Sequence, residues 1–224
     1  MKIIILIRSY ERPNYLRTTI KTLLNSDINK VKKIYVYDDN SKSQETHNIL
    51  NNLDKKLFTV IKGKKNYGVN KSFVYFLKNI RSRYKNKKNI LIITIDNDVI
   101  MKKNWIDILS KAFINAKKYY KSNKLILTGF NSTNAHVNTY KNRIYSKKNI
   151  FYRKQSIGGV NMVFDIAFLN FVIKIWNKGA DWGIVHKMIK LKYPILCLNK
   201  SVINHIGRYG RWSSPNDYNY DKYF

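Results

Sequence analysis

Two carboxylates, Asp96 and Asp98, follow an almost purely apolar run of the sequence, Ile90 to Ile95. A short, β-branched run with polar flanks is typical of a strand buried in a parallel sheet. Open α/β sheets bind ligands where such strands end. Carboxylate oxygens suit Mg²⁺ or Mn²⁺, which in turn bind substrate phosphates. A turn that caps the next helix would use the same residue types, so the position after this strand is what favours a metal site.

The elements that must position these carboxylates alternate between strand and helix patterns in the N-terminal half. The expected strands are 3–7, 34–37, 58–61 and 90–95, and the expected helices are 14–25, 44–53 and 70–83. Strands separated by helices of this length indicate βαβ units and a largely parallel sheet. Ser43 is expected to cap the second helix, because a hydroxyl oxygen can accept from a free helix N–H group.

The C-terminal half is less regular. Its expected elements are a helix at 104–120, a strand at 125–129, a long loop or irregular hairpin at 131–155, and strands at 157–164, 195–198 and 202–206. Asp165 is expected to cap a following helix, and another helix is expected to run from Asp181 towards Lys192. Gly158 and Gly159 would let a ligand approach the backbone closely.

Polar clusters follow four of the predicted strands, at 8–12, 38–41, 66–71 and 96–98. In a parallel sheet these ends converge on one edge, so four separate segments would line one crevice. A tyrosine ring can stack on a base, a carboxylate can accept from a base N–H, and Arg or Lys can balance diphosphate charge. Each cluster alone could be a turn or a helix cap, but their conjunction favours a nucleotide site.

The formal net charge of +30 is extreme. A polyanionic partner, an anionic membrane surface or phosphate-rich substrates would explain it. A compositional bias towards Lys, Asn and Ile would explain it equally well. The lysines occur in short clusters throughout the chain and not in one block. This scatter favours the compositional explanation over a nucleic-acid-binding stripe, although peripheral contact with an anionic membrane stays compatible with it.

Targeting signals and disulfides are not expected. No apolar run approaches the roughly 20 residues that span a bilayer, and the apolar start of the chain lacks a signal-peptide cleavage site. Cys197 is the only cysteine, so an internal disulfide is excluded and a reducing compartment is favoured. The expected location is the cytoplasm.

The ordered set of motifs resembles the GT-A glycosyltransferases, especially those of family 2. The matching segments are 7–12, 37–41, Asn66-x-Gly68-x-Asn70, Asp96-x-Asp98, 158–164 and 179–182. Two positions depart from the pattern: Arg8 stands where Thr or Ser is usual, and Ala180 replaces an acidic residue. The resemblance implies one α/β, Rossmann-like GT-A domain with a mostly parallel central sheet flanked by helices and a small antiparallel portion in the C-terminal half.

The resemblance also implies a division of that domain. Residues 1–100 would form the nucleotide-binding half, 101–210 the acceptor and catalytic half, and 211–224 a tail. Tyr10 and Asp39 would hold the base, with Arg12 and Lys71 near the base or the phosphates. Further residues expected to contact the nucleotide sugar are Arg8, Asn97, Trp182, Arg208 and Arg211.

The chemistry implied by the resemblance falls on four residues. Asp96 would contact the ribose or the donor sugar, and Asp98 would bind Mn²⁺ or Mg²⁺ at the diphosphate. His205 would complete the metal site, because a C-terminal histidine does so in many GT-A enzymes; a hydrogen-bonded core histidine is the alternative. Asp181 would be the general base, since it is the only carboxylate left in its motif, and a simple helix cap is its alternative.

The resemblance therefore implies a metal-dependent, inverting glycosyltransferase. It would move a sugar from a nucleotide-diphosphate sugar, with UDP-sugar favoured, to a hydroxyl group of a glycan or glycoprotein. A basic nucleic-acid-binding protein, a sugar nucleotidylyltransferase and an inactive nucleotide-binding relative are the alternatives. No specific nucleic acid is expected as a partner, and segment 8–13 lacks the glycines of a nucleotidylyltransferase phosphate loop.

Overall fold

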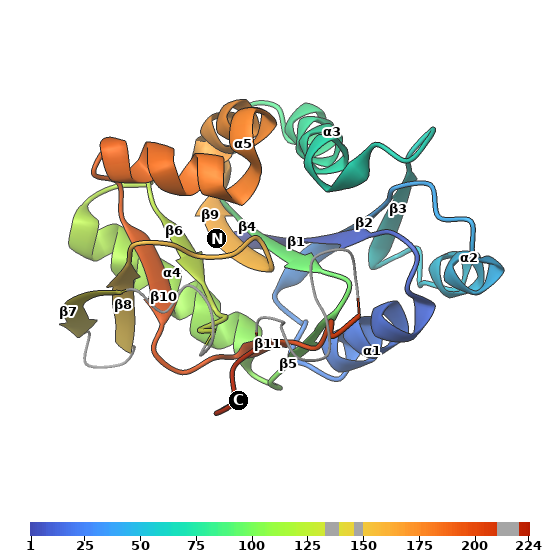
Figure 1. The fold of residues 1–224 in the computed structure, drawn as a ribbon, viewed down its shortest axis with the longest axis horizontal. Helices are drawn as coiled ribbons and strands as arrows, with labels where there is room; N and C mark the ends of the chain where they lie inside the picture. The colour runs from blue at the N-terminus through green and yellow to red at the C-terminus, as the bar shows by residue number, and fades with distance from the viewer. Residues whose placement is uncertain (133–138, 146–149, 210–219) are drawn as a thin grey trace.

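The computed structural model describes residues 1–132, 139–145, 150–209 and 220–224 (Figure 1). The elements of the N-terminal half are β1 (Lys2–Ser9), α1 (Pro13–Leu24), β2 (Val31–Asp38), α2 (Gln44–Asn51), β3 (Phe58–Lys62), α3 (Gly68–Arg83), β4 (Ile90–Asp96) and β5 (Val99–Met101). Those of the C-terminal half are α4 (Trp105–Tyr120), β6 (Ile126–Thr128), β7 (Thr139–Tyr145), β8 (Ile150–Lys154), β9 (Asn161–Asp165), η1 (Ile166–Phe168), α5 (Leu169–Lys190), β10 (Ile195–Leu198) and β11 (Ile203–His205).

A central sheet organises the described part of the chain. Its nine strands have the order β3-β2-β1-β4-β9-β6-β10-β8-β7. β1 pairs in parallel with β2 and with β4, and β2 pairs in parallel with β3. Antiparallel pairing begins at β9, which lies beside β4. A second, two-stranded antiparallel sheet joins β11 to β5. The expected α/β fold with its antiparallel portion is confirmed.

Helices cover both faces of this sheet. Figure 1 shows α3 and α5 on one side and α1, α2 and α4 on the other. Alternate residues of β1 point to opposite faces, as strand geometry requires. Ile3, Ile5 and Ile7 therefore pack in the cluster that contains α1 and α4, while Ile4 and Leu6 pack in the cluster that contains α3 and α5. A strand buried on both faces explains why its sequence is apolar without alternation.

Most predicted elements of the N-terminal half agree with the observed ones to within two or three residues. Ser43 caps α2 by accepting from the Thr46 N–H group, as expected. β5 was not predicted, because a three-residue strand is too short to show a period. The region predicted as a loop or irregular hairpin contains β7 and β8, which pair antiparallel with a register shift.

One predicted strand is wrong in part. The sequence suggests a strand over 157–164, but β9 begins only at Asn161, and 157–160 form an irregular turn. Glycines weaken a strand because they offer no side chain to pack. Gly159 in this turn uses its backbone groups to contact side chains from β1 and α5. Asp165 caps η1, as expected of a helix start, by accepting from the Ala167 N–H group.

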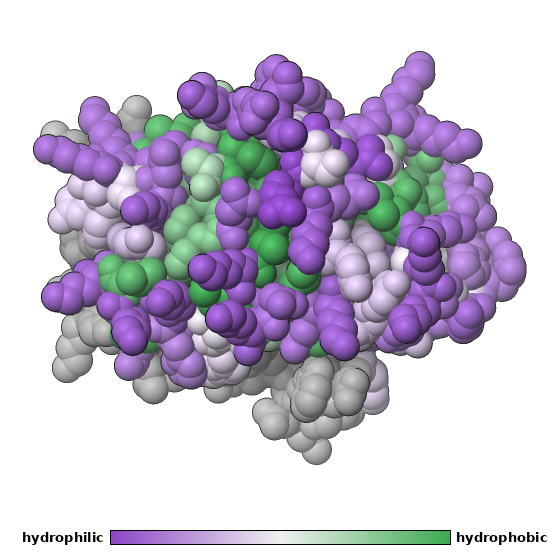
Figure 2. Space-filling model, turned by 90° about the horizontal axis from the view of Figure 1, so that it is seen from above, coloured by the Kyte–Doolittle hydropathy of each residue, from purple (hydrophilic) through white to green (hydrophobic). Residues whose placement is uncertain are grey.

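The surface over α3 and α5 is mainly hydrophilic. Figure 2 shows polar side chains spread over this face around smaller apolar patches. Exposed apolar side chains on these two helices include Val69, Tyr75, Trp182 and Ile189. Within the described residues, no helix has the length and apolar character needed to cross a bilayer.

Candidate functional site

The loops that follow β1, β2, β3 and β4 meet at the carboxyl edge of the sheet. The Glu11 N–H group donates to Ser41 Oγ at 2.7 Å, which joins the first two loops. The Gly68 N–H group donates to Asp39 Oδ2 at 2.8 Å, which joins the second to the third. Asn97 Nδ2 donates to the Glu11 carbonyl at 3.3 Å, which joins the fourth to the first. The predicted convergence of these four segments is therefore observed.

The loop between β1 and α1 reverses direction through two left-handed residues. Glu11 and Arg12 have φ values of 50° and 60°, a region that non-glycine residues adopt rarely. The Glu11 carboxylate holds the loop in place by accepting from the N–H groups of Lys42 and Ser43. α1 then begins at Pro13, whose fixed φ suits a first helical position. In this arrangement the Arg12 side chain reaches the fourth loop.

Asp98 lies at the centre of a buried charge cluster. Its side chain is 6 % exposed, and Oδ2 lies 2.6 Å from Arg12 Nη1 and 3.2 Å from His205 Nε2. The pairing of β11 with β5 places His205 opposite Val99 and so beside Asp98. Burial acts to raise the pKa of Asp98, but the hydrogen bond to His205 and the charges of His205 and Arg12 outweigh it, so the pKa is lowered.

The chain after β11 lies directly on this cluster. The Ile206 N–H group donates to the Asp98 carbonyl at 2.9 Å. A Cβ atom at Gly207 would lie 2.6 Å from His205 Nε2 and closer still to Asp98 Oδ2. Any other residue here would have to displace the side chains of Asp98 and His205, because a real Cβ atom essentially never approaches other heavy atoms so closely.

The Asp98 cluster fits a divalent cation. Asp98 Oδ1 is buried and has no hydrogen-bond partner among the described residues, and a buried polar atom without a partner is costly. A carboxylate oxygen beside an imidazole is a donor set that suits Mn²⁺. Among the described residues, no group of three or more His, Cys, Asp or Glu side chains gathers in this way. Water and a diphosphate would have to supply the other ligands.

Arg8 and Asp96 form a second ion pair beside the first. They occupy paired positions of β1 and β4, and Arg8 Nε donates to Asp96 Oδ1 at 2.7 Å. Desolvation raises the pKa of Asp96 to about 6, although Arg8 acts to lower it. Arg8 Nη2 also donates to the Gly159 carbonyl at 2.8 Å.

Asp181 contacts the same glycine, Gly159, at the backbone N–H group of that glycine. Its Oδ2 accepts from the Gly159 N–H group at 3.1 Å, and its Oδ1 accepts from the N–H group of Trp182. α5 changes direction just before it (Figure 1), because Gly179 and Ala180 have non-helical backbone angles. The helical run that starts near Asp181 agrees with the helix start expected there.

Ala180 holds a strained conformation at this bend. Its φ of 54° and ψ of −144° lie close to a region that glycine alone occupies readily. We expect Ala180→Gly to raise the free energy of unfolding by about 1 kcal/mol, because it removes a Cβ clash at a positive φ. The midpoint of thermal unfolding should rise by roughly 2–4 °C in calorimetry.

Ala116→Gly is the matched control for this prediction. Ala116 lies in the regular interior of α4, where glycine costs about 1 kcal/mol relative to alanine. The two substitutions are chemically identical and should change the unfolding midpoint in opposite directions. A lower midpoint for both would contradict the strained conformation at Ala180.

The remaining predicted residues lie around this edge in different environments. Asp39 is buried, and its carboxylate accepts from the backbone N–H groups of Tyr67 and Gly68; burial raises its pKa, and these bonds oppose that effect. Tyr10 is 44 % exposed, and Lys71 is exposed on α3. Trp182 is exposed beside His186, and Arg208 is exposed after Gly207. Arg211 lies outside the described residues.

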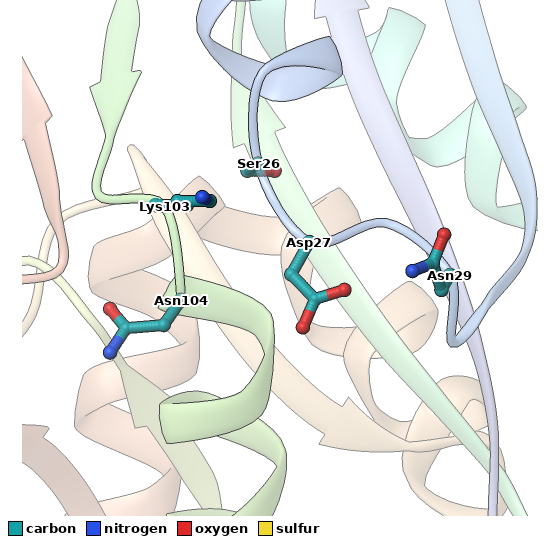
Figure 3. Close-up of a pocket in the computed structure, with 5 residues that line it drawn as sticks. All are labelled: Ser26, Asp27, Asn29, Lys103 and Asn104. Atoms are coloured by element: carbon teal, nitrogen blue, oxygen red, sulfur yellow. The ribbon is translucent and has the colours of Figure 1, made fainter.

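A surface hollow of about 510 Å³ lies elsewhere. The turn after α1 and the turn before α4 line it with Ser26, Asp27, Asn29, Lys103 and Asn104 (Figure 3). None of these residues belongs to the candidate site, and the turn after α1 precedes the amino end of β2. The hollow is therefore at the sheet edge opposite the converging loops.

Comparisons with solved structures agree with this fold. The TarS 1-349 structure from S. aureus in complex with UDP-GlcNAc aligns with a TM-score of 0.66 and 20% identity, covering 94% of this chain and 60% of that one. The structure of GalNAc-T7 with UDP, GalNAc and Mn²⁺ aligns with a TM-score of 0.64 and 13% identity, covering 91% of this chain and 43% of that one. At this identity the likeness shows the fold, and this chain spans less than two thirds of either structure.

Sequence comparison gives the family. No curated protein matches the chain. The family model described as Glycosyl transferase family 2 matches residues 4–168, which include most of β1, all elements from α1 to η1, and the Asp96 and Asp98 pair. The resemblance noted from the motifs is thus confirmed, and the chain belongs to glycosyl transferase family 2.

Proposed function

We propose that the protein is a metal-dependent, inverting glycosyltransferase that uses a nucleotide-diphosphate sugar, with a UDP-sugar as the donor. The observation that carries this proposal is the buried Asp98 carboxylate at the converging loops of a family 2 fold, with one oxygen that has no hydrogen-bond partner in the described part of the chain. The UDP-GlcNAc in the TarS structure and the UDP and Mn²⁺ in the GalNAc-T7 structure support the choice of donor and metal.

Asp98 and His205 would hold the metal. A bound divalent cation neutralises the charge that develops on a diphosphate leaving group. Gly207 would leave room for the metal beside Asp98 and His205, since a side chain at residue 207 would occupy that space. The lone imidazole favours Mn²⁺ over Mg²⁺, which prefers oxygen ligands.

Arg12 would bind the diphosphate oxygens. Its Nε and Nη2 atoms are buried and have no hydrogen-bond partner among the described residues. The guanidinium is held over the Tyr15 ring at 4.3 Å and by Asp98, so its unpaired donors are already oriented. A planar guanidinium with free donors matches phosphate oxygens well.

Asp181 would act as the general base towards a hydroxyl group of a glycan or glycoprotein. An inverting displacement needs a base that removes the acceptor proton on the face opposite the leaving group. The Asp181 side chain is half-buried and is oriented by the Gly159 N–H group. Asp96 would contact the ribose or the donor sugar, and Tyr10 and Asp39 would hold the base.

A thermal shift experiment tests the proposal. The purified protein is melted with a panel of nucleotide sugars, each with and without Mn²⁺. A ligand at 100 times its Kd adds about 2.7 kcal/mol to the unfolding free energy, which is a rise of roughly 5–10 °C for a chain of this size. We expect this rise for UDP-sugars only when Mn²⁺ is present.

Two outcomes would count against the proposal. If no nucleotide sugar stabilises the protein in the presence of Mn²⁺, the donor assignment fails. Tight binding to DNA or RNA with a steep salt dependence, unchanged in Asp98→Ala, would instead support a nucleic-acid-binding protein.

A further inference from the structure

We propose that Arg8 is a positioning residue that couples the donor-side carboxylate of Asp96 to the general base Asp181 through the backbone of Gly159. This inference rests on the proposed function. It differs from the role that the family resemblance implies for Arg8, which is direct contact with the nucleotide sugar.

The Arg8 guanidinium is fixed on its edges and on its faces. Nε donates to Asp96 Oδ1 at 2.7 Å and Nη2 donates to the Gly159 carbonyl at 2.8 Å. The guanidinium carbon lies 4.7 Å from the centre of the Phe73 ring and 5.5 Å from that of Trp176. With a side chain 12 % exposed, Arg8 has its main donors and its faces committed to protein groups. Arg8 is therefore better placed to orient Asp96 and Gly159 than to bind a ligand.

Gly159 transmits the position of Arg8 to Asp181. Its carbonyl accepts from Arg8, and its N–H group donates to Asp181 Oδ2 at 3.1 Å. The two groups lie on the two peptide planes that meet at the Gly159 Cα atom, so a displacement passes from one to the other where the neighbouring side chains restrain this residue. Three hydrogen bonds therefore connect the Asp96 carboxylate to the Asp181 carboxylate: Arg8 to Asp96, Arg8 to Gly159, and Gly159 to Asp181.

Side chains of the same network pack closely around Gly159. A Cβ atom at Gly159 would lie 3.2 Å from Trp176 Cη2, 3.4 Å from Arg8 Nη2 and 3.5 Å from Asp181 Oδ2. The same three side chains therefore enclose the backbone that joins them. Close packing of this kind passes a displacement on to neighbouring groups.

Arginine suits this place and lysine does not. A guanidinium is a planar fork whose separate N–H groups can bind a carboxylate and a carbonyl while its faces stack on rings. A lysine ammonium keeps the charge beside Asp96 but is a single point on a flexible stem. Arg8→Lys should therefore preserve the ion pair with Asp96 and lose the defined contact with Gly159.

Steady-state kinetics of Arg8→Lys test the proposal. We expect kcat to fall by about 10- to 100-fold with the donor KM changed little, because a displacement of the order of 1 Å at a reacting group costs about 10²-fold. Arg8→Met, which also loses the charge, should lose more activity than Arg8→Lys. Arg17→Lys is the matched control: Arg17 is half-exposed on α1 and pairs with Glu45, and this variant should retain wild-type kinetics.

A double-mutant cycle separates coupling to the base from other effects. If Arg8 acts through Asp181, Arg8→Lys should cost less than about 3-fold in kcat when Asp181→Asn is already present, because residues that act as a unit are not additive. A full 10- to 100-fold cost in that background would overturn the proposal. So would a rise in donor KM with kcat unchanged, which would make Arg8 a donor ligand.

Hydrogen exchange provides a readout that does not need turnover. Arg8→Lys should speed amide exchange in peptides that cover Gly159, because the Gly159 carbonyl loses the Arg8 donor that holds this residue, and so its N–H bond to Asp181, in place. Unchanged exchange there would overturn the coupling. If wild-type protein transfers no sugar at all, the proposed function fails, and the exchange result still decides whether Arg8 positions Gly159.

Gly159→Ala keeps the proposal testable if the Arg8 variants fold poorly. The added methyl group would lie 3.2 Å from Trp176 Cη2, which is tighter than an ordinary contact, and in van der Waals contact with Arg8 and Asp181, while every side chain of the network stays present. We expect a fall in kcat of about 10-fold or more with donor KM unchanged. Wild-type kcat in this variant would argue against transmission through Gly159.

Discussion

Asp181→Asn is expected to lower kcat by about 10²- to 10⁴-fold while donor affinity stays the same, because general-base catalysis contributes rate accelerations of this size. Asparagine has the size of aspartate, and its side-chain oxygen can still accept from the Gly159 N–H group. It cannot take a proton from the acceptor hydroxyl group. Initial-rate kinetics give kcat, and calorimetric titration of the UDP-sugar in Mn²⁺ gives the donor Kd.

Asp107→Asn is the matched control for this variant. Asp107 lies on α4 and pairs at the surface with Lys30 at 2.7 Å, so the same change of charge occurs away from the candidate site. Surface ion pairs contribute about 1 kcal/mol or less, and activity should be unchanged. If Asp181→Asn retains wild-type kcat, Asp181 is only a cap for the second half of α5. A donor Kd weakened as strongly as kcat would place Asp181 at the donor instead.

Asp98→Ala is expected to reduce turnover by about 10²- to 10³-fold and to weaken donor binding in Mn²⁺ as well, since a catalytic metal stabilises several kcal/mol of transition-state charge. The variant removes the one carboxylate whose buried oxygen is unpaired among the described residues. It also leaves Arg12 and His205 without their shared partner. Turnover rates and the spectroscopic titration of free Mn²⁺ measure the two effects separately.

Asp98→Asn distinguishes loss of the metal from loss of folding. It preserves the shape of the side chain and an oxygen that can accept from Arg12, so the protein should fold, yet it removes the negative charge that attracts the cation. We expect turnover close to that of Asp98→Ala. An unchanged dependence of turnover on Mn²⁺ concentration in both variants would rule out Asp98 as the metal ligand. Donor affinity should be lost in the Asp98 variants and retained in Asp181→Asn. This difference distinguishes a metal ligand from a general base.

Several features of the site follow from local sequence. The apolar runs of β1 and β4 predict buried parallel strands, because helices cover both faces of such strands. Parallel strands send their carboxyl ends to one edge, so the convergence of the four polar loops follows from the same pattern. The motif order also gave the family correctly. These inferences need only the period of hydrophobic residues and the positions of polar residues within single segments.

The pairings within the site depend on contacts between distant segments. Arg8 meets Asp96 because β1 and β4 pair in that register, and it meets Gly159 across 151 residues of sequence. His205 reaches Asp98 through the pairing of β11 with β5; a strand is predicted around β11, but its three-residue partner β5 is too short to show a period. The bend at Ala180 opposes the preference of alanine for a regular helix, so propensity could not predict it.

The sequence by itself therefore determined which segments end at the binding edge and which residue types stand there, since periodicity and turn chemistry are local properties. Tertiary structure decided which charges meet: Asp98 with Arg12 and His205, and Asp96 with Arg8. These ion pairs depend on the register of the paired strands and on the close approach of the backbone at Gly159 and Gly207. The physical reason is that a register or a close contact depends on the packing of elements far apart in the chain, which no local pattern encodes.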